Sequence, residues 1–123
     1  MPQEKANILF VDDEPGWRDL FAWQLSLKGY SVTCADTGVE AIEKSKHGAF
    51  DLMITDFNMP GMTGIEAFLA IKQTQPLLKV ILITGMVLES HAQKFKEAIC
   101  IQKPFDFNSM IQTIQQTLMS SHV

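Results

Sequence analysis

Five short apolar runs, separated by longer amphipathic stretches, are the feature of this sequence that most narrows its possible folds. The runs are rich in β-branched side chains and contain few polar positions. This pattern is typical of strands that are buried on both faces of a parallel sheet. The sequence therefore predicts five strands, at about residues 7–12, 31–35, 51–55, 79–84 and 99–102.

The stretches between the runs carry apolar residues at helical spacing. They predict five helices, at about residues 15–28, 38–47, 63–75, 89–98 and 106–119. Thr63 and Glu66 form a capping-box pattern at the start of the third helix, and Asp106 is the expected N-cap of the fifth. Strands that alternate with helices indicate an α/β domain, a doubly wound parallel sheet covered on both faces. We expect one such domain over residues 1–123.

Charge and composition limit what this domain binds. The chain of 123 residues has a net charge of -4, and its ten Lys and Arg are scattered, which argues against direct binding of nucleic acid. The apolar runs are far too short to span a membrane, and the first residues show no signal-peptide pattern. Cys34 and Cys100 are too few for a disulfide framework, so we expect a reduced, cytoplasmic protein.

Polar residues stand where four of the predicted strands end. Ligands of open parallel sheets bind beyond the carboxyl ends of the strands, where the strand order reverses. The residues at these ends are Asp12 and Asp13, Asp56, Thr84 and Lys103. Each one alone is as easily a turn or capping residue, but their occurrence at four strand ends predicts a shared site.

These side chains suit a phosphoryl group beside a metal ion. Carboxylates that lie close together repel unless a cation joins them, and Mg²⁺ is a cation that prefers oxygen ligands. Thr84 offers a hydroxyl group, and Lys103 offers a mobile positive charge for phosphate oxygens. A carboxylate in this setting can attack phosphorus and form an acyl phosphate.

Four segments of the chain resemble the receiver domains of two-component response regulators. They are residues 11–14 (Val-Asp-Asp-Glu), 56–64 (Asp-x-x-Met-Pro-x-x-x-Gly), 83–85 (Ile-Thr-Gly) and 103–105 (Lys-Pro-Phe). The likeness covers essentially the whole chain, and residues 56–64 are its most specific part. It implies a flavodoxin-like (βα)5 fold with strand order 2-1-3-4-5, and a regulatory phosphoprotein rather than an enzyme.

The resemblance also implies a role for each residue of the predicted site. Asp56 would be the phosphoacceptor, Thr84 would turn its hydroxyl toward the phosphoryl group, and Lys103 would pair with it. The implied ligands of Mg²⁺ (or Mn²⁺) are Asp12, Asp13, Asp56 and the backbone carbonyl of Asn58. The donor would be a phosphohistidine of a sensor histidine kinase or of a histidine phosphotransfer domain. The signal would pass to an unidentified output protein or domain through a conformational change.

Two features depart from the family pattern. Cys100 stands three positions before Lys103, where the family commonly has Tyr or Phe, and the stretch from Thr84 to Lys103 is a few residues short. Both fall on the usual output face, formed by the fourth helix, the fifth strand and the fifth helix. We expect phosphorylation to be retained and its readout to differ. The sequence leaves the oligomeric state open.

Three other functions compete with this interpretation. A phosphatase of the haloacid-dehalogenase type would need Asp-x-Asp after its first strand, where this chain has Asp12-Asp13-Glu14. A flavin-binding domain would need a phosphate cradle there, and an acidic loop would repel the flavin phosphate. A receiver-like module that binds partners without phosphorylation stays open because of the altered output face.

Overall fold

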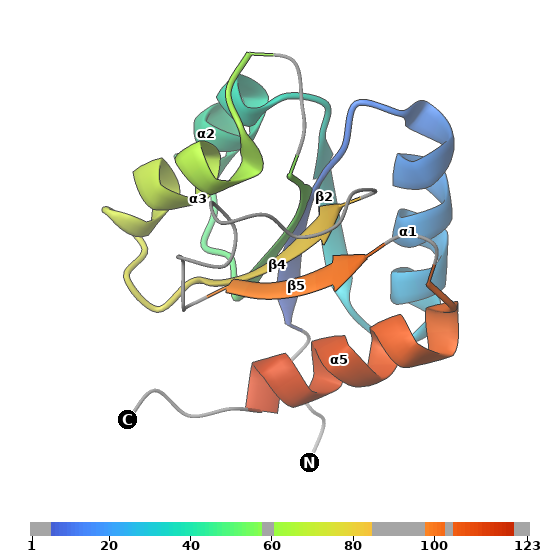
Figure 1. The fold of residues 1–123 in the computed structure, drawn as a ribbon. Coiled ribbons are helices and arrows are strands. Elements are labelled where there is room, and N and C mark those ends of the chain that lie inside the picture. Colours follow the sequence, from blue (N-terminus) through green and yellow to red (C-terminus); the bar gives the residue numbers. More distant parts are fainter. Residues whose placement is uncertain (1–5, 58–60, 85–97, 103–104, 120–123) are drawn as a thin grey trace.

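The computed structural model describes residues 6–57, 61–84, 98–102 and 105–119, which form a five-stranded parallel sheet between helices (Figure 1). The strand order is β2-β1-β3-β4-β5. The strands are β1 (Asn7–Val11), β2 (Ser31–Ala35), β3 (Leu52–Asp56), β4 (Lys79–Thr84) and β5 (Ala98–Gln102). The predicted doubly wound, flavodoxin-like fold with order 2-1-3-4-5 is therefore confirmed.

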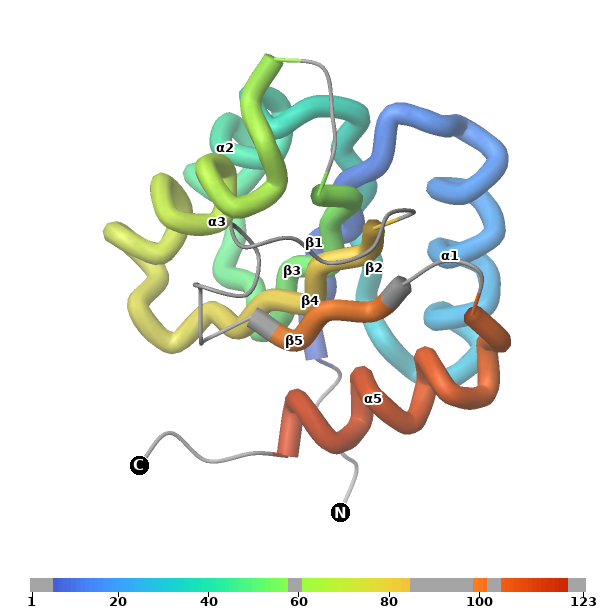
Figure 2. The backbone as a smooth tube through the Cα atoms, viewed as in Figure 1, coloured from blue at the N-terminus to red at the C-terminus, as the bar shows by residue number. Residues whose placement is uncertain are grey.

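Helices cover both faces of this sheet, as the tube in Figure 2 shows. They are α1 (Pro15–Leu27), α2 (Gly38–Ser45), α3 (Gly64–Lys72) and α5 (Phe107–Met119). The pair α2 and α3 packs on one face, and the pair α1 and α5 packs on the other. The fourth predicted helix, at 89–98, lies outside the described residues except for Ala98, which is the first residue of β5.

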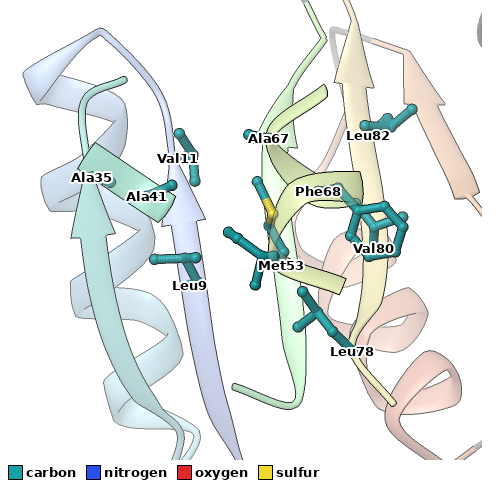
Figure 3. Packing of buried hydrophobic residues seen from close by; sticks show 11 residues of the cluster. Leu9, Val11, Ala35, Ala41, Met53, Ala67, Phe68, Leu78, Val80 and Leu82 are labelled. Carbon is teal, nitrogen blue, oxygen red and sulfur yellow. The ribbon is translucent and has the colours of Figure 1, made fainter. Parts of the chain in front are cut away.

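The alternation of side chains along buried strands builds two separate cores. Leu9 and Val11 of β1 point toward α2 and α3, where they join Met53 and Phe68 (Figure 3). The intervening residues, such as Phe10, point toward α1 and α5. Residues 8–11 are at most 1% exposed. Burial on both faces is the reason that these runs lack polar positions.

Side-chain caps fix the starts of α3 and α5. The Thr63 hydroxyl accepts a hydrogen bond from the backbone N–H of Glu66, whose carboxylate accepts one from the N–H of Thr63, so the predicted capping box is confirmed. Asp106 accepts from the backbone N–H of Ser109 at 2.8 Å, as expected of the N-cap of α5.

The third helix is shorter than predicted, because it ends at Lys72 rather than near residue 75. Just beyond this end, the side chain of Gln75 holds three backbone groups of a distant segment. Its amide nitrogen donates to the carbonyls of Ser45 and Gly48 at 2.9 and 3.0 Å, and its carbonyl accepts from the N–H of Phe50 at 2.8 Å. The N–H of Gln75 still bonds to the carbonyl of Ile71 at 3.0 Å, but Pro76 follows and disfavours helical backbone at the preceding residue.

The two cysteines lie on the opposite edge strands of the sheet, Cys34 on β2 and Cys100 on β5. Both are free, which confirms that they form no disulfide with each other. Burial raises the pKa of both thiols, so each is held in its protonated, less nucleophilic form.

Candidate functional site

The register of the sheet brings the predicted site residues to one edge. Val11 pairs with Thr55, so the next residues along β1 and β3, Asp12 and Asp56, follow neighbouring strands at the same level. Asp56 in turn pairs with Ile83, so Thr84 stands one residue further along β4. Neighbouring strands lie about 4.8 Å apart, and the structure therefore places Asp12, Asp56 and Thr84 on three adjacent strands at their carboxyl ends.

Asp12 is a buried acid, only 1% exposed. Its Oδ1 accepts a hydrogen bond from the backbone N–H of Glu14 at 2.9 Å. Its own N–H donates to the carbonyl of Ala35 at 3.1 Å, and its carbonyl accepts from the guanidinium of Arg18 at 2.8 Å. A buried carboxylate is costly unless it is hydrogen-bonded or paired with positive charge, so this environment is consistent with a cation ligand.

Asp56 is half-buried at the last position of β3, one residue beyond the predicted end of that strand. Its backbone is held on two sides. The N–H of Phe57 donates to the carbonyl of Ile83 at 2.8 Å, and a Cβ atom at Gly64 would lie only 2.7 Å from the carbonyl oxygen of Asp56. The first turn of α3 therefore packs directly on the chain that carries the expected phosphoacceptor, and only glycine permits this approach.

Of the remaining predicted site residues, two are described by the structure and two are not. Asp13 is exposed, in the bend between β1 and α1, and Thr84 is 3% exposed at the end of β4. Asn58 and Lys103 lie outside the described residues, so their roles stay predictions.

The donor set is chemically suited to Mg²⁺, because every predicted ligand is an oxygen atom and Mg²⁺ is bound by one or two carboxylates and waters. Within the described ranges, no three His, Cys, Asp or Glu side chains gather in a group that could hold a metal ion. The predicted set includes the carbonyl of Asn58, which those ranges do not contain. The metal therefore stays a prediction that rests on the type and order of the ligands.

Two features of the site were missed by the sequence reasoning. The first is the guanidinium of Arg18 on the acidic loop, which no motif marks. The second is a ring contact between Trp17 of α1 and Phe105, whose centroids lie 5.7 Å apart. Phe105 is the apolar last residue of the Lys-Pro-Phe motif. Its aromatic side chain could have suggested a packing contact, but the sequence does not name the partner. The contact joins the start of α1 to the chain that follows β5.

Comparison with known proteins decides the family. The family model described as the response regulator receiver domain matches residues 8–115. The chain belongs to this family. The response regulator receiver protein CpdR of Brucella abortus is 31% identical over 118 residues, which cover 94% of this chain and 98% of CpdR.

Other relatives are longer than this receiver domain. The transcriptional regulatory protein GlrR of Escherichia coli is 32% identical over 98% of this chain, but the match covers only 28% of GlrR. Sensor protein EvgS of the same organism is 32% identical, and the match covers 10% of its length. Receiver domains thus occur alone and as parts of regulators and sensor kinases.

Solved structures agree with this assignment. Chemotaxis protein CheY4 of Vibrio cholerae has a TM-score of 0.86 at 29% identity, with 93% of this chain and 99% of CheY4 covered. Response regulator TrrA of Thermotoga maritima, solved in complex with Mg(2+)-BeF, has a TM-score of 0.77 at 33% identity, with 91% and 98% covered.

Membership fixes the general function of this receiver domain. Receiver domains are regulatory modules of two-component signalling that interact with histidine kinases or phosphotransfer proteins, and they are not enzymes in the usual sense. Within the described part of the chain, no helix has the length and apolar character that a membrane crossing needs.

Cys100 is the residue at which this chain departs from the family pattern on β5. It lies in the middle of β5, pairs in register with Leu82 of β4, and packs partly buried against the core beneath α3. Its small thiol occupies the position at which the family commonly has an aromatic ring.

Proposed function

We propose that this receiver domain takes a phosphoryl group onto Asp56 from a phosphohistidine donor in a Mg²⁺-dependent reaction, and passes on the signal through a conformational change. The observation that carries the proposal is the register, which sets Asp12, Asp56 and Thr84 on three adjacent strand ends. Membership in the receiver family supports the same chemistry.

Each site residue has a chemical part in this transfer. A carboxylate oxygen of Asp56 bonds to phosphorus while the bond from phosphorus to the donor's imidazole nitrogen breaks, and the imidazole keeps the electron pair. The hydroxyl of Thr84 donates to a phosphoryl oxygen, and the ammonium of Lys103 pairs with another. Because these groups serve the acyl phosphate at each stage, the domain assists both its own phosphorylation and its dephosphorylation.

A divalent cation would be held by Asp12, Asp13, Asp56 and the backbone carbonyl of Asn58. When bound, Mg²⁺ or Mn²⁺ supplies positive charge that offsets the negative charge of the acids and of the phosphoryl group. The Mg(2+)-BeF complex of TrrA supports this assignment, since that receiver is 33% identical to this chain.

The partners follow from the chemistry. The donor is a sensor histidine kinase or a histidine phosphotransfer domain, and both act in the reducing cytoplasm that suits two free cysteines. Cys100 cannot act as an aromatic switch, so the readout of phosphorylation depends on other side chains of the face that contains β5. The protein or domain that receives the signal is not specified by these residues.

Intact mass after incubation with acetyl phosphate and Mg²⁺ tests the proposal. We expect a gain of one phosphoryl group that is absent in Asp56→Asn and absent when a chelator removes the metal. If the unchanged chain gains no mass, even with phosphorylated histidine kinases as donors, the phosphoacceptor function is refuted. The altered position of Cys100 would then favour a module that binds its partners without phosphorylation.

A further inference from the structure

We propose that Arg18 is a positioning residue that holds the acidic loop in its metal-binding conformation. The inference rests on the proposed Mg²⁺-dependent function, and it assigns to this function a residue that none of the site motifs contains. Arg18 lies in the first turns of α1, directly behind the loop formed by Asp12, Asp13 and Glu14.

The contact is made to the backbone of the loop rather than to a side chain. A guanidinium nitrogen of Arg18 donates to the carbonyl oxygen of Asp12 at 2.8 Å, in a part-buried setting. This carbonyl belongs to the peptide group that links Asp12 to Asp13. Because a peptide group is planar, a hydrogen bond to its oxygen restricts the rotation of the whole unit, and with it the direction in which Asp13 leaves the chain.

The other two bonds of the loop hold the groups on either side of this carbonyl, and the Arg18 contact holds the carbonyl itself. The N–H of Asp12 is fixed by the carbonyl of Ala35, and its Oδ1 is fixed by the N–H of Glu14. Asp13 is exposed, and in the described part of the chain its carboxylate has no hydrogen-bond or ion-pair partner. Among the described residues its position therefore follows from the backbone, and the Arg18 contact is one of the bonds that hold that backbone.

The charge of Arg18 and its hydrogen bond to the loop have opposite expected effects on metal affinity. The positioning role can therefore be tested by measuring that affinity. Arg18 is always protonated, and its positive charge by itself repels a cation in the acidic loop. Removal of the charge alone would therefore strengthen metal binding. Loss of the support would weaken it, because groups that orient metal ligands typically contribute a factor of about 10 to 100 in affinity.

The test measures Mn²⁺ binding to the unphosphorylated full chain by electron paramagnetic resonance of free Mn²⁺. We expect the dissociation constant to rise about tenfold in Arg18→Met and in Arg18→Gln, the low end of that range because Arg18 supports backbone rather than a ligand atom. Lys44→Met is the matched control. Lys44 also donates its side chain to a main-chain carbonyl, that of Cys34 on the adjacent strand, and it carries the same charge, paired with Glu40, without touching Asp12. We expect its Mn²⁺ affinity to equal or exceed that of the unchanged chain.

A second readout separates positioning from general damage. With acetyl phosphate as donor, the Mg²⁺ concentration that gives half-maximal phosphorylation should rise about tenfold in Arg18→Met, while the rate at saturating Mg²⁺ should stay close to that of the unchanged chain. Unchanged or tighter Mn²⁺ binding in both Arg18 variants would overturn the inference, as would equal weakening in Lys44→Met. If the unchanged chain itself binds no Mn²⁺, the proposed function fails and the inference fails with it.

Discussion

Replacement of Gly64 by alanine tests whether α3 packs directly on the main chain of Asp56, the proposed phosphoacceptor. Gly64 is the first residue of α3, and a Cβ atom there would lie 2.7 Å from the carbonyl oxygen of Asp56, 2.7 Å from Cγ2 of Thr55 and 2.9 Å from Oγ1 of Thr55. Non-bonded carbon atoms are at their best separation near 3.5–4.0 Å. Because the first of these contacts is with backbone, a side-chain rotation cannot relieve it.

The size of the effect follows from two opposing terms. Alanine favours a helix over glycine by up to about 1 kcal/mol, whereas extra volume forced into a well-packed site costs about 1–3 kcal/mol. The clash is severe and involves the backbone, so we expect the second term to exceed the first and Gly64→Ala to lower the free energy of unfolding by about 1–2 kcal/mol. For a domain of this size that is a fall of roughly 3–8 °C in the melting temperature.

Gly16→Ala is the matched control for this substitution. Gly16 also lies in the first turn of a helix, α1, but a Cβ atom there would have no heavy atom within 4 Å. The helix-propensity term then acts alone, so we expect unchanged stability or a gain of up to about 1 kcal/mol.

Urea denaturation followed by circular dichroism measures both variants, and the rate of phosphorylation by acetyl phosphate measures the site. We expect Gly64→Ala to be less stable and also slower, because the displaced carbonyl belongs to Asp56, while Gly16→Ala keeps the rate of the unchanged chain. If Gly64→Ala proved as stable as Gly16→Ala, the close approach of α3 to Asp56 would be refuted.

Three further predictions concern the packing and capping of the scaffold. Phe21→Ala should lower the free energy of unfolding by about 3–5 kcal/mol in urea denaturation, because Phe21 is fully buried and stacks on Phe10 with ring centroids 4.2 Å apart; a loss under 1 kcal/mol would contradict this packing. Gln75→Leu should cost about 2–3 kcal/mol in the same assay, since it removes a side chain that makes three hydrogen bonds to backbone groups, and a neutral effect would show that those groups find other partners. Hydrogen bonds from the backbone N–H and the hydroxyl of Ser109 lower the pKa of Asp106 below its ordinary value of 3.8, so its contribution to stability is complete above that pH and is lost as the pH falls below it. Asp106→Asn keeps the cap but does not titrate, so its thermal stability should fall less between pH 4 and pH 2 than that of the unchanged chain, and identical pH profiles would contradict the cap.

The fold was predictable from the sequence because its signal is spread over many residues. The central strands are buried on both faces and so exclude polar side chains, and the five apolar runs predicted all five strands to within one residue. The strand ends then placed Asp12, Asp56 and Thr84 together, since parallel strands in register end at one edge. The caps at Thr63 and Asp106 were predictable for the same kind of reason, because capping depends on residue type at a fixed spacing.

Contacts to the backbone were not predictable. Every residue carries a main-chain carbonyl, so the residue type does not indicate which carbonyl a side chain will reach. The bond from Arg18 to Asp12, the approach of Gly64 to Asp56 and the three bonds of Gln75 all involve main-chain groups. The end of α3 was predicted about three residues too late, and Pro76 disfavours helical backbone at the residue before it. The roles of Asn58 and Lys103 stay predictions from the family pattern.

The same backbone contacts constrain how a charge added at Asp56 can act on the rest of the domain. The main chain around Asp56 is fixed to β4 by the bond from the N–H of Phe57 to the carbonyl of Ile83, and to α3 by the close approach of Gly64. Packed elements of this kind resist small displacements, so the main chain of β3 offers little movement. Under the proposed function, the response would therefore begin in side chains at the site edge, where Thr84 of β4 offers a hydroxyl to new phosphoryl oxygens. Such a change would reach β5 through the strand pair, in which Thr84 pairs in register with Gln102 and Leu82 with Cys100, a small thiol in place of the family's ring.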